Sequence, residues 1–142
     1  MYQKILLAYN GPAYCTAALR QASDLARLCK AELHLLDVVG TTGWFLIAQS
    51  ESSLDLLGME RKNVQEALES AADELAAQGV NVITSTREGD PVIEIVAYAH
   101  EIQADLAVLG HSDKGILARW FEGSTGAKIL TDLPCSLLIA LG

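Results

Sequence analysis

Short apolar runs alternate with amphipathic helical patterns from one end of this chain of 142 residues to the other. The runs Lys4 to Tyr9 and Leu106 to Leu109 are mostly apolar, as is typical of parallel strands buried on both faces. Parallel strands need crossover connections, and crossover helices pack back onto the sheet. The alternation therefore predicts an α/β fold, a three-layer α/β/α sandwich with a parallel sheet between two helical layers.

Nine elements are expected. Strands are predicted at residues 4–9, 32–39, 80–86, 106–109 and 136–141. The third of these is the most polar, so we place it nearer an edge of the sheet. Helices are predicted at residues 17–28, from Ser52 or Ser53 to Gly79, from Asp90-Pro91 to about 101, and from 124 to about 132.

Length and charge limit the function classes. A chain of this size fits a single domain, residues 1–142, and can bury a hydrophobic core large enough to fold without disulfide bonds or structural metals. Its net charge of −8 argues against a general nucleic-acid binder and against an anionic membrane surface. No pattern of a signal peptide or membrane span is found. Three cysteines at separate places, Cys15, Cys29 and Cys135, favour a reduced, cytoplasmic compartment.

The strand ends predict the location of a binding site. In open parallel sheets, ligands bind beyond the carboxyl ends of the strands, where the strand order reverses. The candidate positions there are Asn10 after the first strand, Asp37-Val38 in the second and Leu109-Gly110 in the fourth.

A glycine-bounded loop follows the fourth strand. It runs from Gly110 to Gly123-Ser124-Thr125, where a helix is expected to begin. Backbone N–H groups that converge at such a turn suit a phosphate, although Ser124 is equally the N-cap of an ordinary helix. Asp113 places a negative charge in the loop. It would repel a phosphate, turn into solvent beside Lys114, or help to hold Mg²⁺.

No catalytic constellation is apparent. The sequence has no Gly-x-Ser-x-Gly elbow and no Gly-x4-Gly-Lys-Ser/Thr loop, and His111 has no second ligand or catalytic partner at a useful spacing. Trp44-Phe45 and Trp120-Phe121 are more typical of a core edge or a dimer seam than of base stacking. We expect no efficient enzyme, no catalytic residues and no resident metal, and leave a weak ATPase open.

In the order and spacing of its motifs the chain resembles the universal stress protein family. The motifs are Ile5-Leu6-Leu7-Ala8-Tyr9-Asn10-Gly11, Leu35-Leu36-Asp37-Val38, Glu88-Gly89-Asp90-Pro91, Ala104 to His111, Lys128-Ile129-Leu130 and Leu133 to Ile139. Together they span nearly the whole length.

The resemblance implies a fold and a set of contacts. The fold is a five-stranded parallel sheet of flavodoxin-like, adenine-nucleotide-hydrolase-like topology, with strand order 3-2-1-4-5. One branch of the family binds ATP or AMP, with Mg²⁺ accompanying ATP. The implied adenine and ribose contacts are Ala8, Asn10, Val38, Leu109 and Gly110, and the implied phosphate contacts are Gly123, Ser124 and Thr125.

Two positions depart from the nucleotide-binding branch. Asp113 stands where its loop has a second glycine, and Asn10 stands where it usually has Asp. A branch that binds no nucleotide often begins this loop with Gly-His, as Gly110-His111 does. Two functions therefore stay open: a stress-response regulator that binds an adenine nucleotide, and a nucleotide-free protein that acts through protein contacts.

The last strand predicts a homodimer. Leu137-Leu138-Ile139-Ala140-Leu141 would leave an aggregation-prone edge if uncovered. The resemblance implies the same interface, because members of the family often dimerise by pairing their last strands.

Overall fold

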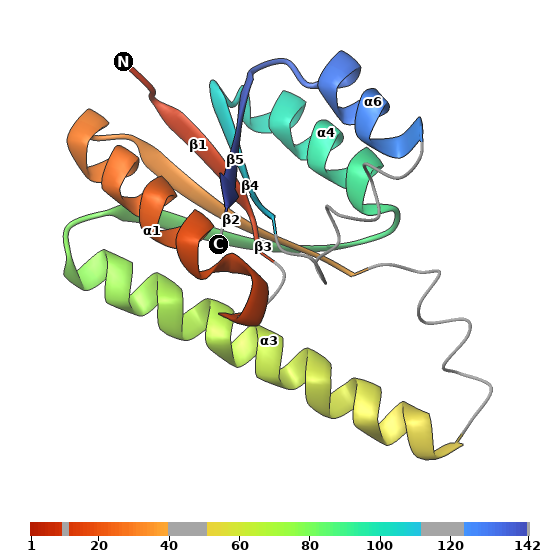
Figure 1. The fold of residues 1–142 in the computed structure, drawn as a ribbon. Coiled ribbons are helices and arrows are strands. Elements are labelled where there is room, and N and C mark those ends of the chain that lie inside the picture. Colours follow the sequence, from red (N-terminus) through yellow and green to blue (C-terminus); the bar gives the residue numbers. More distant parts are fainter. Residues whose placement is uncertain (10–11, 40–50, 112–123, 142) are drawn as a thin grey trace.

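The computed structural model describes residues 1–9, 12–39, 51–111 and 124–141 (Figure 1). Five strands form one parallel sheet: β1 (Lys4–Ala8), β2 (Glu32–Val39), β3 (Asn81–Glu88), β4 (Leu106–His111) and β5 (Ser136–Leu141). Their order is β3-β2-β1-β4-β5, as the resemblance implied. The polar third strand lies at an edge, which confirms that expectation.

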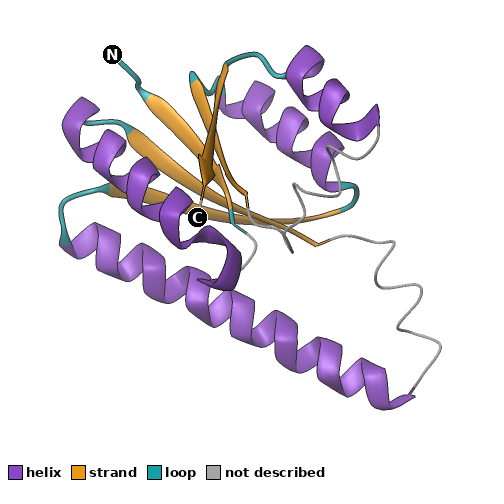
Figure 2. Ribbon diagram, in the orientation of Figure 1, coloured by secondary structure: helices purple, strands orange, loops and turns teal. Residues whose placement is uncertain are grey.

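Helices cover both faces of the sheet (Figure 2). They are α1 (Pro12–Cys29), α3 (Glu51–Ala77), α4 (Pro91–Ile102) and α6 (Ser124–Asp132). Helices α1 and α3 lie on one face and α4 and α6 on the other, so the three-layer α/β/α prediction is confirmed. Helix α1 begins five residues before the predicted start at Ala17, because Pro12 occupies a first helical position that tolerates a missing N–H.

Two apolar clusters hold the layers together. On one face Ile5, Leu7 and Leu35 pack against Ala22 of α1 and Leu68 of α3. The opposite cluster joins alternate strand residues to α4 and α6; its buried members include Leu6, Leu36, Leu109, Ile95 and Ile129. Strands β1, β2, β4 and β5 therefore contribute to both cores, as expected of strands covered on both faces, whereas β3 at the edge contributes Val82 to the cluster under α1 and α3.

The ends of the elements follow the local signals in the sequence. The Asp90 carboxylate accepts hydrogen bonds from the N–H groups of Val92 (3.0 Å) and Ile93 (3.2 Å), which confirms the predicted cap of α4. Gly79 follows α3 with a φ of 87°, a conformation that favours glycine. In α4 the buried residues are Val92, Ile95, Tyr98 and Ala99, whereas Ile93 is mostly exposed.

No helix in the described part of the chain is long and apolar enough to cross a membrane.

Candidate functional site

The centre of the sheet contains a topological switch point. Strands β1 and β4 are neighbours, yet the chain leaves β1 toward β2 and leaves β4 toward β5, in opposite directions along the sheet. In open α/β sheets the carboxyl ends at such a point leave a crevice for a ligand. The edge where β1, β2 and β4 end, here called the carboxyl edge, is therefore the candidate site.

Three of the predicted contacts share one side of this edge. Ala8, Val38 and Leu109 all belong to the cluster that faces α4 and α6. Leu7 pairs with Val108 across β1 and β4, so Ala8 and Leu109 come next in the register. Val38 lies two residues beyond Leu36, the partner of Ala8. The three side chains thus belong to one apolar cluster across neighbouring strands, in which Ala8 and Val38 are half-buried and Leu109 is buried; we call this cluster the apolar surface of the carboxyl edge.

Gly110 lies beside this surface in β4, paired in register with Ala140 of the edge strand. Strand β4 continues through Gly110 to His111, two residues past the predicted end at Leu109. Asp37 is half-buried between the inward-facing Leu36 and Val38, so side-chain alternation turns it toward α1 and α3. The structure therefore separates Asp37 from the surface that Val38 shares with Ala8.

The remaining predicted contacts lie outside the described residues: Asn10, Asp113 and Gly123. Helix α6 begins at Ser124, as the sequence indicates, and Thr125 is its second residue; the side chains of both lie outside the described set. Trp44-Phe45 and Trp120-Phe121 are also outside it. The roles assigned to these positions stay predictions.

The N-terminus of helix α6 places a partial positive charge at the carboxyl edge. It connects two parallel strands, so its N-terminus lies at the edge where β4 ends (Figure 1). The first N–H groups of a helix lack intrahelical partners and together carry about half a positive charge. This end of α6 is therefore suited to an anion such as phosphate.

An ion pair lies between β3 and α4. The Arg87 guanidinium donates two hydrogen bonds to the Glu101 carboxylate and stacks 4.9 Å from the centre of the Tyr98 ring. Hydrogen bonding to Glu101 raises the pKa of Arg87, and the same bonding lowers the pKa of Glu101. Both groups thus stay charged at neutral pH and are already partnered.

A buried polar chain beneath α4 was missed by the sequence analysis. His34 is 5% exposed, its Nδ1 lies 2.9 Å from the Tyr98 hydroxyl, and its Nε2 lies 2.8 Å from Glu32. The Tyr98 hydroxyl is also 3.0 Å from Ser85. Both ring nitrogens of His34 and the hydroxyl of Tyr98 therefore have hydrogen-bond partners. These hydrogen bonds join α4 to β2 and β3 of the sheet.

Two further parts of the chain carry titratable side chains. Cys135 is half-buried against the α4 and α6 cluster, and desolvation raises the pKa of its thiol, as is typical of a small core residue. On α3 the described acidic residues Glu66, Glu69, Asp73 and Glu74 are exposed to solvent. In the described ranges, no three His, Cys, Asp or Glu side chains gather as metal ligands would.

Comparison with known proteins agrees with this architecture. The model of the universal stress protein family matches residues 1–140. The universal stress protein YxiE of Bacillus subtilis is 31% identical over 146 aligned positions, which cover 98% of this chain and 99% of the relative.

Solved structures share the fold. Universal stress protein UspA from Lactobacillus plantarum superposes with a TM-score of 0.76 at 25% identity, covering 98% of this chain and 97% of that one. A universal stress protein family protein from Arabidopsis thaliana, solved with AMP bound, gives a TM-score of 0.69 at 18% identity and covers 98% and 91%.

Proposed function

The chain belongs to the universal stress protein family, and we propose that it is a cytoplasmic stress-response regulator that binds an adenine nucleotide, ATP or AMP, without efficient catalysis. The observation that carries the proposal is the surface formed by Ala8, Val38 and Leu109 at the switch point. An adenine ring needs a flat apolar contact with few charges; the half-buried Ala8 and Val38 would supply it, and the buried Leu109 belongs to the same cluster.

The phosphates would extend from that surface toward the start of α6. Gly110 lacks a Cβ beside the proposed ribose position, and Ser124 opens the helix. Proteins of this fold have been solved in complex with cAMP, AMP and dAMP. These complexes support a nucleotide with one adenine and at least one phosphate as the ligand class.

Calorimetric titration tests the proposal. We expect saturable heat on adding ATP with Mg²⁺ or AMP, and no comparable heat with inorganic phosphate alone, because the adenine surface contributes most of the apolar contact. Absence of both heat and thermal stabilisation at millimolar nucleotide would refute nucleotide binding. Mass spectrometry of small molecules that copurify with the chain identifies the preferred nucleotide.

A nucleotide-free protein acting through protein contacts is the second candidate, because Asp113 stands in the phosphate loop. A like charge about 4–6 Å from a phosphate costs roughly 1–4 kcal/mol, depending on the local dielectric. Replacing Asp113 with Gly separates the candidates. A large gain in ATP affinity would show that the natural chain is disabled for binding, whereas an unchanged affinity would favour nucleotide as its normal ligand.

Weak ATP hydrolysis is measured with a matched variant. If phosphate release comes from this protein, Ser124→Ala lowers it, because Ser124 is a proposed phosphate contact. Release that continues unchanged in that variant would indicate a contaminating enzyme.

We also propose a homodimer through β5. Among the described strands β5 is paired with β4 alone, and its Leu141 is 71% exposed. A second copy of the strand would cover the open edge. Light scattering at micromolar concentration should give the dimer mass, and a monomer mass would contradict this interface.

A further inference from the structure

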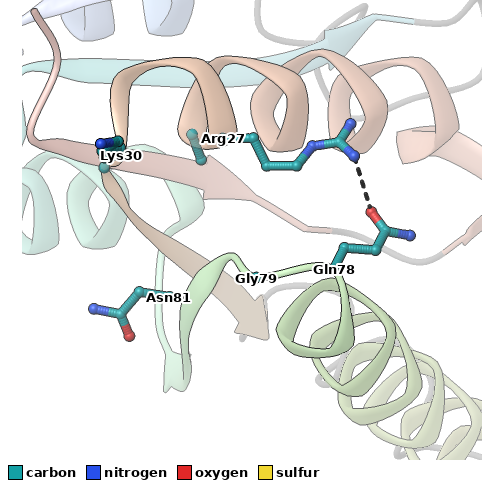
Figure 3. Close-up of a pocket in the computed structure, with 7 residues that line it drawn as sticks. Arg27, Lys30, Gln78, Gly79 and Asn81 are labelled. Atoms are coloured by element: carbon teal, nitrogen blue, oxygen red, sulfur yellow. Dashed lines mark hydrogen bonds between the residues drawn. The ribbon is translucent and has the colours of Figure 1, made fainter.

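A pocket lies at the opposite ends of the strands, where β2 and β3 begin; we call this end of the sheet the amino edge. The pocket has a volume of about 520 Å³ and lies between the C-terminal ends of α1 and α3 (Figure 3). This volume is in the range of small-molecule sites. Its floor includes Ala26 and Ala31, which are 2% and 3% exposed, so the base of the pocket is formed by the packed core.

The polar lining consists of donors. Arg27 and Lys30 come from the end of α1, Gln78 from the turn after α3, and Asn81 from the first position of β3. Figure 3 shows the Lys30 and Asn81 side chains on one side of the pocket and the joined Arg27 and Gln78 on the other. Although the chain has 18 acidic and only 10 basic residues, no carboxylate lines this pocket.

Two of these donors have no protein partner. No hydrogen bond or ion pair within the described ranges uses the Lys30 ammonium or the Asn81 carboxamide, whereas Arg27 is paired with Asp24 and donates to Gln78 over 3.4 Å. Asp24 offsets much of the charge on Arg27. The net positive charge of the pocket therefore comes mainly from Lys30.

The backbone around the pocket is fixed. Lys30 has a φ of 56°, and the N–H of Ala31 donates to the carbonyl of Ala26 over 2.9 Å. Across the pocket the N–H of Val80 donates to the carbonyl of Leu75 over 3.0 Å. A Cβ placed on Gly79 would meet no atom within 4 Å, so the space beside this turn is open. A ligand would enter without reordering the turns, which lowers the entropic cost of binding.

We propose that this pocket binds a small anionic metabolite through a phosphate or carboxylate group. Lys30 supplies the charge, and the carboxamide nitrogen of Asn81, on the same side of the pocket, donates to the same anionic group, while Gln78 faces the rest of the ligand from the other side. The helix-end role of Arg27, which offsets the partial negative charge at the end of α1, explains that residue but not the unpartnered Lys30 and Asn81. The pocket is separate from the nucleotide surface, because the two lie at opposite ends of the strands.

Amide NMR of the full chain tests this site, with inorganic phosphate and citrate as separate probes at constant ionic strength. We expect saturable shifts of the Lys30, Gly79 and Asn81 amides with at least one probe. The probe that binds more tightly assigns the ligand as a phosphate or a carboxylate. Shifts that do not saturate, or that are no larger here than over the rest of the surface, would overturn the proposal.

A matched pair of variants makes the test specific. Lys30→Asn removes the charge and keeps a residue type that tolerates positive φ, so the fold is retained. It should weaken binding about tenfold, as expected for one charge-assisted contact. Lys62→Gln, at an exposed position of α3, removes the same charge elsewhere and should leave the affinity unchanged. Equal effects of the two variants would mean that the probes sense only net charge.

A second, independent variant introduces a negative charge at the rim of the pocket. Asn81→Asp places a carboxylate in the proposed anion position, and Asn81 is exposed, so folding should tolerate it. Binding of whichever probe the parent chain binds should be lost while ATP binding is unchanged. If phosphate or citrate still binds this variant with the original affinity, the pocket is not the site.

Discussion

The amino edge, where the strands begin, and the carboxyl edge, where they end, are built in different ways. At the amino edge, charged side chains bind the backbone: the Asp105 carboxylate accepts from the N–H groups of Gln3 (2.8 Å) and Lys4 (3.1 Å). At the carboxyl edge, the described surface consists of small and apolar side chains, Ala8, Val38 and Leu109. One edge fixes the register of the strands, and the other leaves an apolar surface beside a helix N-terminus. Stability and nucleotide binding should therefore respond to different substitutions.

The largest effect is expected at the amino edge. Asp105→Ala removes the acceptor for two backbone N–H groups that join β1 to the start of β4, and should lower the free energy of unfolding by about 2–3 kcal/mol. Urea denaturation measures this loss. The control Asp73→Ala, at an exposed position of α3, should change stability by less than about 0.5 kcal/mol. Nucleotide affinity per folded molecule should not change, and a parallel loss of affinity would break the separation of the two edges.

The next effect concerns the carboxyl edge. Ala8→Phe adds a ring to the cluster that Ala8 shares with Val38 and Leu109, and should weaken adenine nucleotide binding at least tenfold, which corresponds to about 1.4 kcal/mol. Overpacking costs about 1–3 kcal/mol of stability, so affinity is measured by calorimetry under conditions where the variant is folded. Ile83→Phe on β3 adds the same ring away from this surface. An Ala8→Phe variant that binds ATP like the parent would place the ligand elsewhere.

A smaller effect is expected at the start of α4, a helix on the face of the sheet to which Ala8 and Val38 point. Asp90→Ala removes the cap of two N–H groups and should cost about 1 kcal/mol. Asp90→Ser keeps an acceptor at this position and should recover most of the loss in thermal denaturation. If both variants lost equal stability, the contribution would come from the charge of Asp90 rather than from its hydrogen bonds.

The smallest effect belongs to the ion pair of Arg87 and Glu101. The pKa of Glu101 is lowered in the folded protein, so its stabilising contribution is complete above the ordinary carboxyl value of about 4.3. It is lost as the pH falls through the lowered folded value. Glu101→Gln should therefore reduce the acid sensitivity of the melting temperature slightly, and by less than any change above, because exposed ion pairs contribute little. An equal change in Glu66→Gln, on the exposed face of α3, would mean that the change in acid sensitivity does not come from the ion pair of Arg87 and Glu101.

Local signals in the sequence predicted the elements well. Asp90-Pro91, Gly79 and the apolar run from Ser136 act within a few residues, and each marks a boundary in the structure. The predicted start of α1 at residue 17 was wrong, because the apolar periodicity begins there whereas the helix already begins at Pro12, a residue that suits a first helical turn. The extra residues of β3 and β4 depend on pairing with neighbouring strands, which short patterns do not encode.

The contacts between distant residues were beyond local patterns. His34 and Tyr98 are 64 positions apart, and their hydrogen bond depends on the packing of α4 against β2. The Asp105 bonds to β1 likewise span about a hundred residues. In contrast, the strand order was available from the family resemblance, and with it the shared position of Ala8, Val38 and Leu109. These three residues are apolar and of types common in any protein core, so the sequence alone gives little indication that they contact a ligand.

The most direct test observes that surface during ligand addition. Methyl NMR of alanine, valine and leucine groups can be recorded while AMP, or ATP with Mg²⁺, is titrated into the full chain. If nucleotide binds at the carboxyl edge, saturable shifts should be largest at Ala8, Val38 and Leu109, with Ala26 and Ala31 at the amino edge unchanged. Unaltered methyl signals at saturating nucleotide, or shifts centred on the amino edge, would contradict it.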